Sequence, residues 1–202
     1  MDLKEFKNLV DLFFYQAEKQ SSQSVFLEWL NPRNKKKFTW GETSSNIYKL
    51  AKVLKSNIAD GDRCLLVSEN RPEWLISDIA IMLANGITVP AYTTYTEKDY
   101  KYLIEDCQPS IIIVSNEEMH DKLKNIIKEK SFIRKVITFE KIRELNYDNR
   151  YLDFNSITKN NLQESDKIKN INLKRNSCAC IIYTSGTGGN PKGVILSHGG
   201  IL

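Results

Sequence analysis

The sequence predicts an α/β fold built on a mostly parallel sheet that helices cover. From Gly61 onward, strand-like and helix-like segments alternate along the chain, and such alternation indicates crossover connections between parallel strands. The helix signals agree with this order, because Pro72 suits a first helical turn and Asn85-Gly86 suits a C-terminal cap. With 202 residues, of which 41% are hydrophobic and 27% charged, the chain has the composition of a soluble globular protein that buries a core.

Ahead of Gly61 we expect a helix, a β-hairpin and a second helix. Apolar side chains keep the helical i, i+3, i+4, i+7 spacing between Phe6 and Ala17, so the chain opens with an amphipathic helix. Residues 25–30 favour a strand, residues 31–34 (Asn-Pro-Arg-Asn) a turn, and residues 38–40 the returning strand. The apolar positions 47, 50, 51 and 54 then share one face of a helix.

After Gly61 the predicted strands are 64–67, 87–89, 111–114 and 136–139, and the predicted helices are 72–84, 97–106 and 117–128. Thr96 and Asp99 resemble a capping box at the start of the second of these helices. Residues 140–176 are rich in Asn, Lys, Asp and Ser, so we expect a surface connection there, with one short helix at residues 154–160. Residues 177–183 return to an apolar strand.

The composition argues against several classes of function. The formal net charge is +4, and the lysines are scattered rather than gathered with aromatic residues, which disfavours nucleic-acid binding. The N-terminus lacks the order of a secretory signal, and the most apolar stretch, residues 76–84, is short and contains Asp78. We therefore expect a cytoplasmic protein without a membrane span, and peripheral membrane contact stays open. Two histidines are too few for a histidine-based metal site, and the four cysteines are expected to be reduced and buried.

Residues 183–198 carry the most chemical information. They read Tyr-Thr-Ser-Gly-Thr-Gly-Gly-Asn-Pro-Lys-Gly-Val-Ile-Leu-Ser-His. Small residues let the backbone turn tightly and direct successive N–H groups at one point, which makes an anion-binding nest. Thr184, Ser185 and Thr187 can add hydroxyl donors, while Lys192 adds a mobile positive charge. A strand, a glycine- and hydroxyl-rich loop and then a lysine is the pattern that polyphosphate binding requires.

Other glycine-rich loops fit these residues less well. A Walker loop needs Gly-Lys-Ser/Thr leading into a helix, whereas Lys192 stands between Pro191 and Gly193 and precedes the β-prone residues 194–196. A dinucleotide-binding fingerprint would need a glycine where Pro191 stands. A turn between two strands that binds nothing is the remaining alternative, and the number of agreeing positions disfavours it.

This segment resembles the signature of the AMP-forming adenylating enzymes, which include acyl-CoA synthetases, luciferases and peptide-synthetase adenylation domains. That signature reads close to Tyr-Thr-Ser-Gly-Thr-Thr-Gly-x-Pro-Lys-Gly-Val, and the chain matches it from Tyr183 to Val194 except at Gly188. The family has Thr, Ser or Glu there, so the departure removes one side-chain donor. Residues 38–40, 61–63, 70–74 and 86–92 are also similar to this family, most closely to its long-chain fatty acid–CoA ligase branch.

The resemblance implies that residues 1–202 are the incomplete, truncated N-terminal part of an AMP-binding (adenylation) domain, without its C-terminal remainder and lid domain. It implies that the full-length enzyme uses ATP and Mg²⁺ to convert a fatty acid into acyl-AMP, and coenzyme A to form acyl-CoA. The nucleotide-binding residues that it implies are Thr184, Ser185, Gly186, Thr187, Gly188, Gly189 and Lys192. It further gives Lys192 a catalytic role and Thr184 a role in positioning the metal ion. We expect the 202-residue chain alone to be inactive, and the alternative is a non-catalytic remnant or partner-binding fragment.

Four other residues that invite a functional interpretation are better explained structurally. His198 lies near an expected helix start, where a lone histidine more often has a structural or capping role. Arg71, Glu73 and Trp74 open a helix after a strand end, but we expect Trp74 in the core and Glu73 to favour the helix N-terminus.

Overall fold

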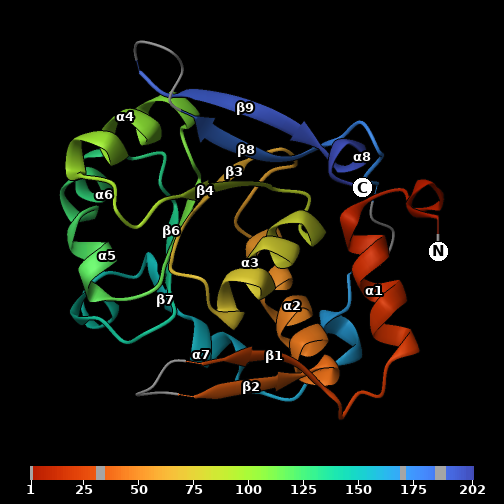
Figure 1. The fold of residues 1–202 in the computed structure, drawn as a ribbon. Coiled ribbons are helices and arrows are strands. Elements are labelled where there is room, and N and C mark those ends of the chain that lie inside the picture. The colour runs from red at the N-terminus through yellow and green to blue at the C-terminus, as the bar shows by residue number, and fades with distance from the viewer. Residues whose placement is uncertain (1, 31–34, 169–171, 185–189) are drawn as a thin grey trace.

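The computed structural model describes residues 2–30, 35–168, 172–184 and 190–202, and in these ranges seven strands form one sheet in the order β7-β6-β5-β3-β4-β8-β9 (Figure 1). All neighbouring strands pair in parallel except β8 and β9, which pair antiparallel. The predicted mostly parallel, helix-covered sheet is therefore confirmed. The strands are β3 (Arg63–Val67), β4 (Ile87–Ala91), β5 (Ile111–Val114), β6 (Lys135–Thr138), β7 (Tyr151–Asp153), β8 (Cys178–Thr184) and β9 (Lys192–Ser197).

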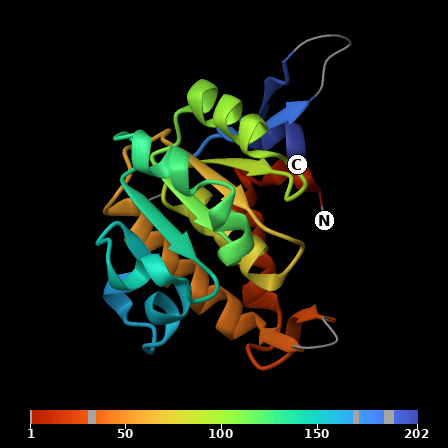
Figure 2. The same cartoon turned by 90° about the vertical axis from the view of Figure 1, so that its left-hand side faces the viewer.

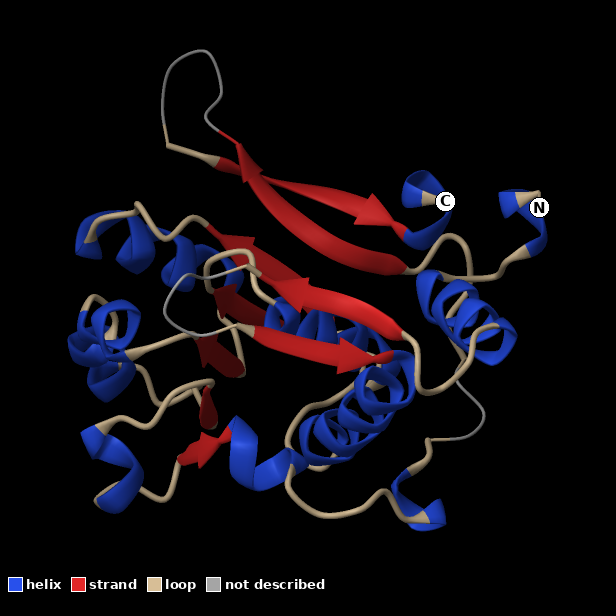
Figure 3. Ribbon diagram, turned by 60° about the horizontal axis from the view of Figure 1, so that its bottom comes forward, coloured by secondary structure: helices blue, strands red, loops and turns tan. Residues whose placement is uncertain are grey.

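Helices cover both faces of this sheet, as Figure 3 shows. The helices are α1 (Leu9–Lys19), α2 (Trp40–Lys55), α3 (Pro72–Leu83), α4 (Glu97–Cys107), α5 (Glu117–Asp121), α6 (Lys124–Glu129), α7 (Phe154–Thr158) and α8 (His198–Ile201). A separate antiparallel hairpin of β1 (Val25–Trp29) and β2 (Lys36–Thr39) leads into α2. Its expected turn, residues 31–34, lies outside the described residues.

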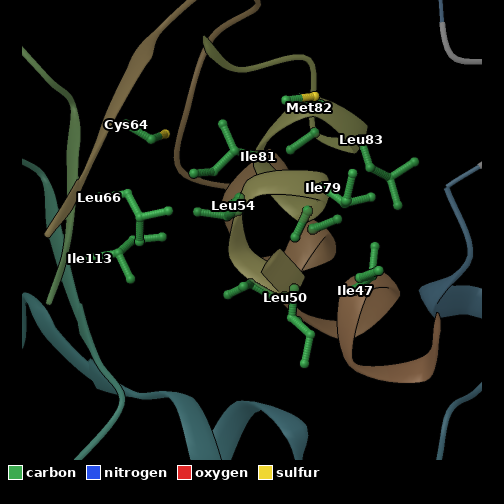
Figure 4. Close-up of a cluster of buried hydrophobic side chains, with 14 of the residues drawn as sticks. Ile47, Leu50, Leu54, Cys64, Leu66, Ile79, Ile81, Met82, Leu83 and Ile113 are labelled. Atoms are coloured by element: carbon green, nitrogen blue, oxygen red, sulfur yellow. The ribbon is translucent and has the colours of Figure 1, made fainter. Parts of the chain in front are cut away.

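Each central strand buries both of its faces. In β3, Cys64 and Leu66 pack on the side of α1, α2 and α3, whereas Leu65 and Val67 pack on the side of α4, α5 and α6. Successive strand residues point to opposite faces, which explains why these strands read as continuous apolar runs. Figure 4 shows the first of the two cores, where Leu66 and Ile113 of the sheet face side chains of α2 and α3.

Local capping sets most helix boundaries where the sequence predicts them. Thr96 and Asp99 form the expected capping box, and Pro72 stands at the first position of α3. At the other end of α3, Asn85 has a φ of 68° and the Gly86 N–H donates to the Ile81 carbonyl at 2.9 Å. This left-handed cap ends the helix and turns the chain into β4.

The structure corrects four of the predicted details. Trp40 begins α2 rather than ending a strand, because Thr39 caps the helix with Glu42. The single helix predicted at 117–128 is two helices, α5 and α6, separated by a turn at Lys122 and Leu123. Strand β7 lies inside the stretch predicted as a surface connection, although α7 confirms its short helix. Cys178 is half-buried rather than buried, while all four cysteines are free thiols, as expected.

The two ends of the chain lie side by side (Figures 1 and 3). The Asn8 amide donates to the Leu173 carbonyl at 3.2 Å, and the Arg175 guanidinium donates to the Phe6 carbonyl at 2.6 Å. These bonds fasten the start of the chain to the segment that leads into β8.

Candidate phosphate-binding site

The β8–β9 hairpin sets the two ends of the candidate loop. Strand β8 ends at Thr184 and strand β9 begins at Lys192, and these two residues are register partners in the antiparallel ladder. Residues that are directly opposite in such a ladder extend their side chains to the same face. Thr184 and Lys192 are both exposed, so the structure brings one hydroxyl and one ammonium group together at the base of the loop.

The other residues that the sequence predicts to bind phosphate cannot be placed in the same way. Ser185, Gly186, Thr187, Gly188 and Gly189 lie outside the described residues. Their expected role in forming an anion nest therefore stays a prediction. In Figure 2 the described stems of the hairpin extend beyond the helices that cover the sheet.

Thr184 and Lys192, which flank the loop, stand at the edge of the sheet where ligands of parallel α/β proteins bind. Strand β8 runs parallel to β4, with Thr88 opposite Cys180, so Thr184 lies at the same edge as the carboxyl ends of β3, β4 and β5. Open parallel sheets bind ligands in the crevice outside these strand ends. The topology thus gives the loop a position that suits ligand binding.

A cavity of about 510 Å³ lies at this edge, beside the end of β8. The residues that give it polar groups follow the ends of β3 and β4, and they include Ser68, Glu69, Asn70, Tyr92 and Thr93. On the opposite side it is lined by Tyr183, the residue before the loop begins. We did not predict these residues from the sequence. The signal that could have identified them is that they follow the ends of two predicted parallel strands.

The loop stems also contact helix α4. The Tyr102 hydroxyl donates to the Pro191 carbonyl at 3.0 Å, and the Tyr183 hydroxyl donates to the Asp106 carboxylate. A smaller cavity of about 220 Å³ lies between α4 and the stems. Helix α4 thus supports both strands that carry the loop.

Arg71 and Glu73 form a buried ionic cluster at the start of α3. The Arg71 guanidinium donates to Glu73 at 2.9 Å and to Glu140 at 2.9 Å, and it lies 4.5 Å from the ring centre of Trp29. The Lys36 ammonium also contacts Glu73, at 2.6 Å. Burial alone would raise the pKa of Glu73, but the hydrogen bonds from Arg71 and Lys36 outweigh it, and the pKa lies below its usual value. The cluster joins the β1–β2 hairpin to the sheet, which is a structural role, as expected.

His198 has the structural position that the sequence predicts, whereas Trp74, which was expected in the core, also lines the cavity at the sheet edge. His198 is fully buried, and its Nδ1 accepts a hydrogen bond from the Leu9 N–H at 3.3 Å. Burial lowers the pKa of His198, so it is neutral near pH 7. Trp74 is half-buried and packs against the core that contains α2 and α3.

The described donors suit a magnesium–polyphosphate group. Lys192 supplies a positive charge, and the hydroxyl oxygen of Thr184 is the kind of hard ligand that Mg²⁺ prefers. Within the ranges 2–30, 35–168, 172–184 and 190–202, no three histidine, cysteine or acidic side chains are grouped so as to hold a metal ion. A magnesium role for Thr184 therefore depends on its hydroxyl acting together with the phosphate oxygens of the nucleotide.

Comparison with known proteins points to one family. The profile of the AMP-binding enzymes matches residues 13–202. The chain is 32% identical, over 204 residues, to long-chain-fatty-acid–CoA ligase ACSBG2 of Mus musculus, covering 95% of this chain and 29% of the relative. It is 29% identical, over 175 residues, to long-chain-fatty-acid–CoA ligase ACSBG1 of Rattus norvegicus, covering 83% of this chain and 24% of the relative. The chain thus spans less than a third of the length of these relatives.

Solved structures share the fold. An anthranilate–CoA ligase, AuaEII, in complex with anthranoyl-AMP matches 98% of this chain and 36% of its own, with a TM-score of 0.81 and 20% identity. A luciferase-like enzyme from the nonluminescent Zophobas morio mealworm matches 98% of this chain and 44% of its own, also with a TM-score of 0.81 and 20% identity. Among the described residues, every helix is too short or too polar to cross a membrane.

Proposed function

Because the chain belongs to the AMP-binding enzyme family, we propose that it supplies the N-terminal part of an AMP-binding domain that activates a carboxylic acid with ATP. The observation that carries this proposal is the pairing of Thr184 with Lys192 at the carboxyl edge of the parallel sheet. In the full-length protein the acid carboxylate would attack the α-phosphorus of ATP, which gives an acyl adenylate and releases pyrophosphate. The thiol of coenzyme A would then displace AMP.

The residues of this chain would act mainly by neutralising charge. The Lys192 ammonium would follow the negative charge that builds on the departing pyrophosphate, and an interaction that strengthens in this way lowers the barrier. The Thr184 hydroxyl would help to orient Mg²⁺, which supplies charge neutralisation when bound. Ser185, Thr187 and the loop glycines 186, 188 and 189 would surround the phosphates with hydroxyl and N–H donors.

We propose a long-chain fatty acid as the acid. This choice is supported by the long-chain-fatty-acid–CoA ligases of mouse and rat, to which the chain is about 30% identical. The cavity at the sheet edge, about 510 Å³, adjoins the proposed phosphate site and would receive part of a substrate. We expect the reaction to take place in the cytoplasm, with peripheral contact with a membrane as one source of the acid.

The test is fatty acid-dependent exchange of labelled pyrophosphate into ATP, which measures adenylate formation. We expect exchange with the full-length protein that contains this chain, and none with residues 1–202 alone, since these span less than a third of the relatives' length. The absence of any exchange by the full-length protein would instead favour a non-catalytic or partner-binding role.

A further inference from the structure

Helix α4 holds both stems of the candidate loop. On the closing stem, the Tyr102 hydroxyl donates to the Pro191 carbonyl at 3.0 Å. On the opening stem, the Tyr183 hydroxyl donates to the Asp106 carboxylate. Tyr102 and Asp106 are four residues apart in α4, so they lie on the same face of the helix, one turn from each other. Two chain segments that are separated by the loop are thus fastened to one rigid element.

Gly193 makes room for the contact of Tyr183 with Asp106. It is the register partner of Tyr183, and directly opposite residues extend to the same face of an antiparallel pair. A Cβ atom at position 193 would lie 2.8 Å from Cγ2 of Ile181 and 3.3 Å from Cζ of the Tyr183 ring. It would also lie 3.4 Å from the Tyr183 hydroxyl oxygen. The absence of a side chain at Gly193 therefore lets the Tyr183 ring lie across β9.

The Tyr183 contact persists across the neutral pH range. Tyr183 is only 4% exposed, and burial raises the pKa of its hydroxyl, as does the hydrogen bond to Asp106. Since the pKa moves up from its ordinary value near 10, the hydroxyl stays protonated and remains a donor. The carboxylate of Asp106, in contrast, belongs to an exposed residue, which makes it a site where a substitution leaves the core unchanged.

We propose that α4 and the hairpin form a positioning latch made of Tyr102, Asp106, Tyr183 and Gly193. The latch fixes where the Lys192 ammonium and the Thr184 hydroxyl stand relative to the sheet edge, and its members position these groups without touching the phosphates themselves. Tyr183 and Gly193, which both belong to the segment that matches the family signature, thereby hold the stems of the loop rather than bind the ligand. The inference rests on the proposed phosphate-binding role of the loop.

The test compares local opening with catalysis in the full-length protein. Asp106→Ala and Tyr102→Phe each remove one latch bond, and Gly193→Ala displaces the Tyr183 ring. We expect amide hydrogen exchange in peptides from β9 to become about tenfold faster in each variant, while peptides from β3 stay within twofold of wild type. We also expect kcat/KM for ATP to fall about tenfold while KM for the fatty acid is unchanged. Asp106→Asn keeps a hydrogen-bond acceptor, so both its β9 amide exchange and its kcat/KM for ATP should be close to those of wild type.

Tyr147→Phe is the matched control, since Tyr147 is 87% exposed, and it should alter neither readout. The latch is refuted if β9 exchange stays within twofold of wild type in Asp106→Ala and Tyr102→Phe, or if β3 and β9 exchange accelerate equally. If only the latch is wrong, the wild-type protein still performs acid-dependent pyrophosphate exchange. If the proposed function is wrong, wild-type exchange is absent, while the hydrogen-exchange result still shows whether α4 holds the stems.

Discussion

Lys192 is the first residue of β9, and its exposed side chain lies directly opposite Thr184. In the full-length enzyme we expect Lys192→Ala to slow adenylate formation by about a hundredfold to a thousandfold, which corresponds to about 3 to 4 kcal/mol of lost transition-state stabilisation. Affinity for the fatty acid should change little. Lys192→Arg should restore only part of the rate, because a planar guanidinium replaces a compact ammonium.

Single-turnover adenylate formation at saturating ATP, with the fatty acid varied, measures both quantities. Lys128→Ala, which removes an exposed lysine of α6, is the control and should behave as wild type. A Lys192→Ala rate within about threefold of wild type, worth under about 1 kcal/mol, would show that Lys192 does not face the phosphates.

At the residue scale, the burial of Asp78 also leads us to expect that the stability of the fold depends on pH. Asp78 places a carboxyl group in a mostly apolar groove between α1, α3 and β8, whose lining also includes Gln16 and Thr88, and burial raises its pKa to about 6. In the unfolded chain the pKa of this carboxyl group is about 3.9, so the folded state holds the proton more tightly. The ionised group therefore lowers the free energy of unfolding increasingly from about pH 4 to pH 6, and the loss remains above pH 6. We expect Asp78→Asn to stabilise the chain by about 1 to 2 kcal/mol at pH 8, since partial exposure reduces the full effect, and by much less at pH 4.

Urea unfolding at pH 4 and pH 8 measures this difference. Glu129→Gln, at an exposed position on α6, is the control for a substitution that removes a carboxyl group from the surface, and its effect on stability should be small. An equal effect of Asp78→Asn at both pH values would contradict the burial of the carboxylate.

At the scale of elements, the ionic cluster of Arg71, Glu73 and Lys36 joins the β1–β2 hairpin to α3. The side chains of Arg71 and Glu73 are 1% and 2% exposed, so neutralising Glu73 leaves the buried Arg71 guanidinium paired with Glu140, whose side chain is 51% exposed. We expect Glu73→Gln to reduce the free energy of unfolding by about 3 kcal/mol. Because the pKa of Glu73 is lowered, the ionised carboxylate stabilises the fold at neutral pH. This contribution is lost as the pH falls through the lowered pKa of Glu73.

Lys37→Ala is the matched control, since it breaks the exposed ion pair of Lys37 with Glu28 in the same hairpin. Exposed pairs contribute about 0 to 1 kcal/mol, so its effect should be small. Equal losses for Glu73→Gln and Lys37→Ala in chemical denaturation would mean that the buried cluster does not fasten the hairpin.

Elements with strong local signals were predictable from the sequence. The capping box of Thr96, the first-turn proline of α3 and the apolar runs of β3 and β5 each depend on residues close to one another in the chain, so their boundaries follow from local chemistry. Strand β7 was missed because its three residues form a strand only by pairing with β6. The break between α5 and α6 was missed because no glycine or proline marks it.

The same distinction applies to the candidate site. The loop and Lys192 could be recognised because the pattern is contiguous. The contacts of Asp106 with Tyr183 and of Tyr102 with Pro191 join residues 77 and 89 positions apart, so only the folded chain brings them together. The cavity-lining residues after β3 and β4 each follow a predicted strand, but the sequence did not show that they line one cavity, because strand order decides which loops are neighbours.

At the scale of the whole molecule, two surfaces favour association of the 202-residue chain. One is the apolar groove of about 430 Å³ between α1, α3 and β8, and the other is strand β9 at the sheet edge, where Ile195 is 69% exposed. Exposed edges and apolar patches promote self-association, so we expect oligomers whose mass rises with protein concentration. Light scattering over a range of concentrations measures this.

Ile195→Lys should shift the chain toward monomer, because a charge on an edge strand opposes pairing with another strand. Glu129→Gln is again the control for a substitution away from both surfaces. A wild-type chain that stays monomeric and melts cooperatively would contradict the prediction.

The contacts between the two ends of the chain impose an order on folding during synthesis. Asn8, Leu9 and Phe6 bond to residues 165 to 189 positions later, so the ribosome must reach Leu173, Arg175 and His198 before these partners exist. At roughly 5 to 20 residues per second, that delay is on the order of 10 to 40 seconds. Strands β3 to β7, whose pairings need only residues up to 153, can assemble meanwhile. Residues 6–9 therefore reach these native contacts later than strands β3 to β7 can pair, and until then they are exposed to chaperones that bind nascent chains.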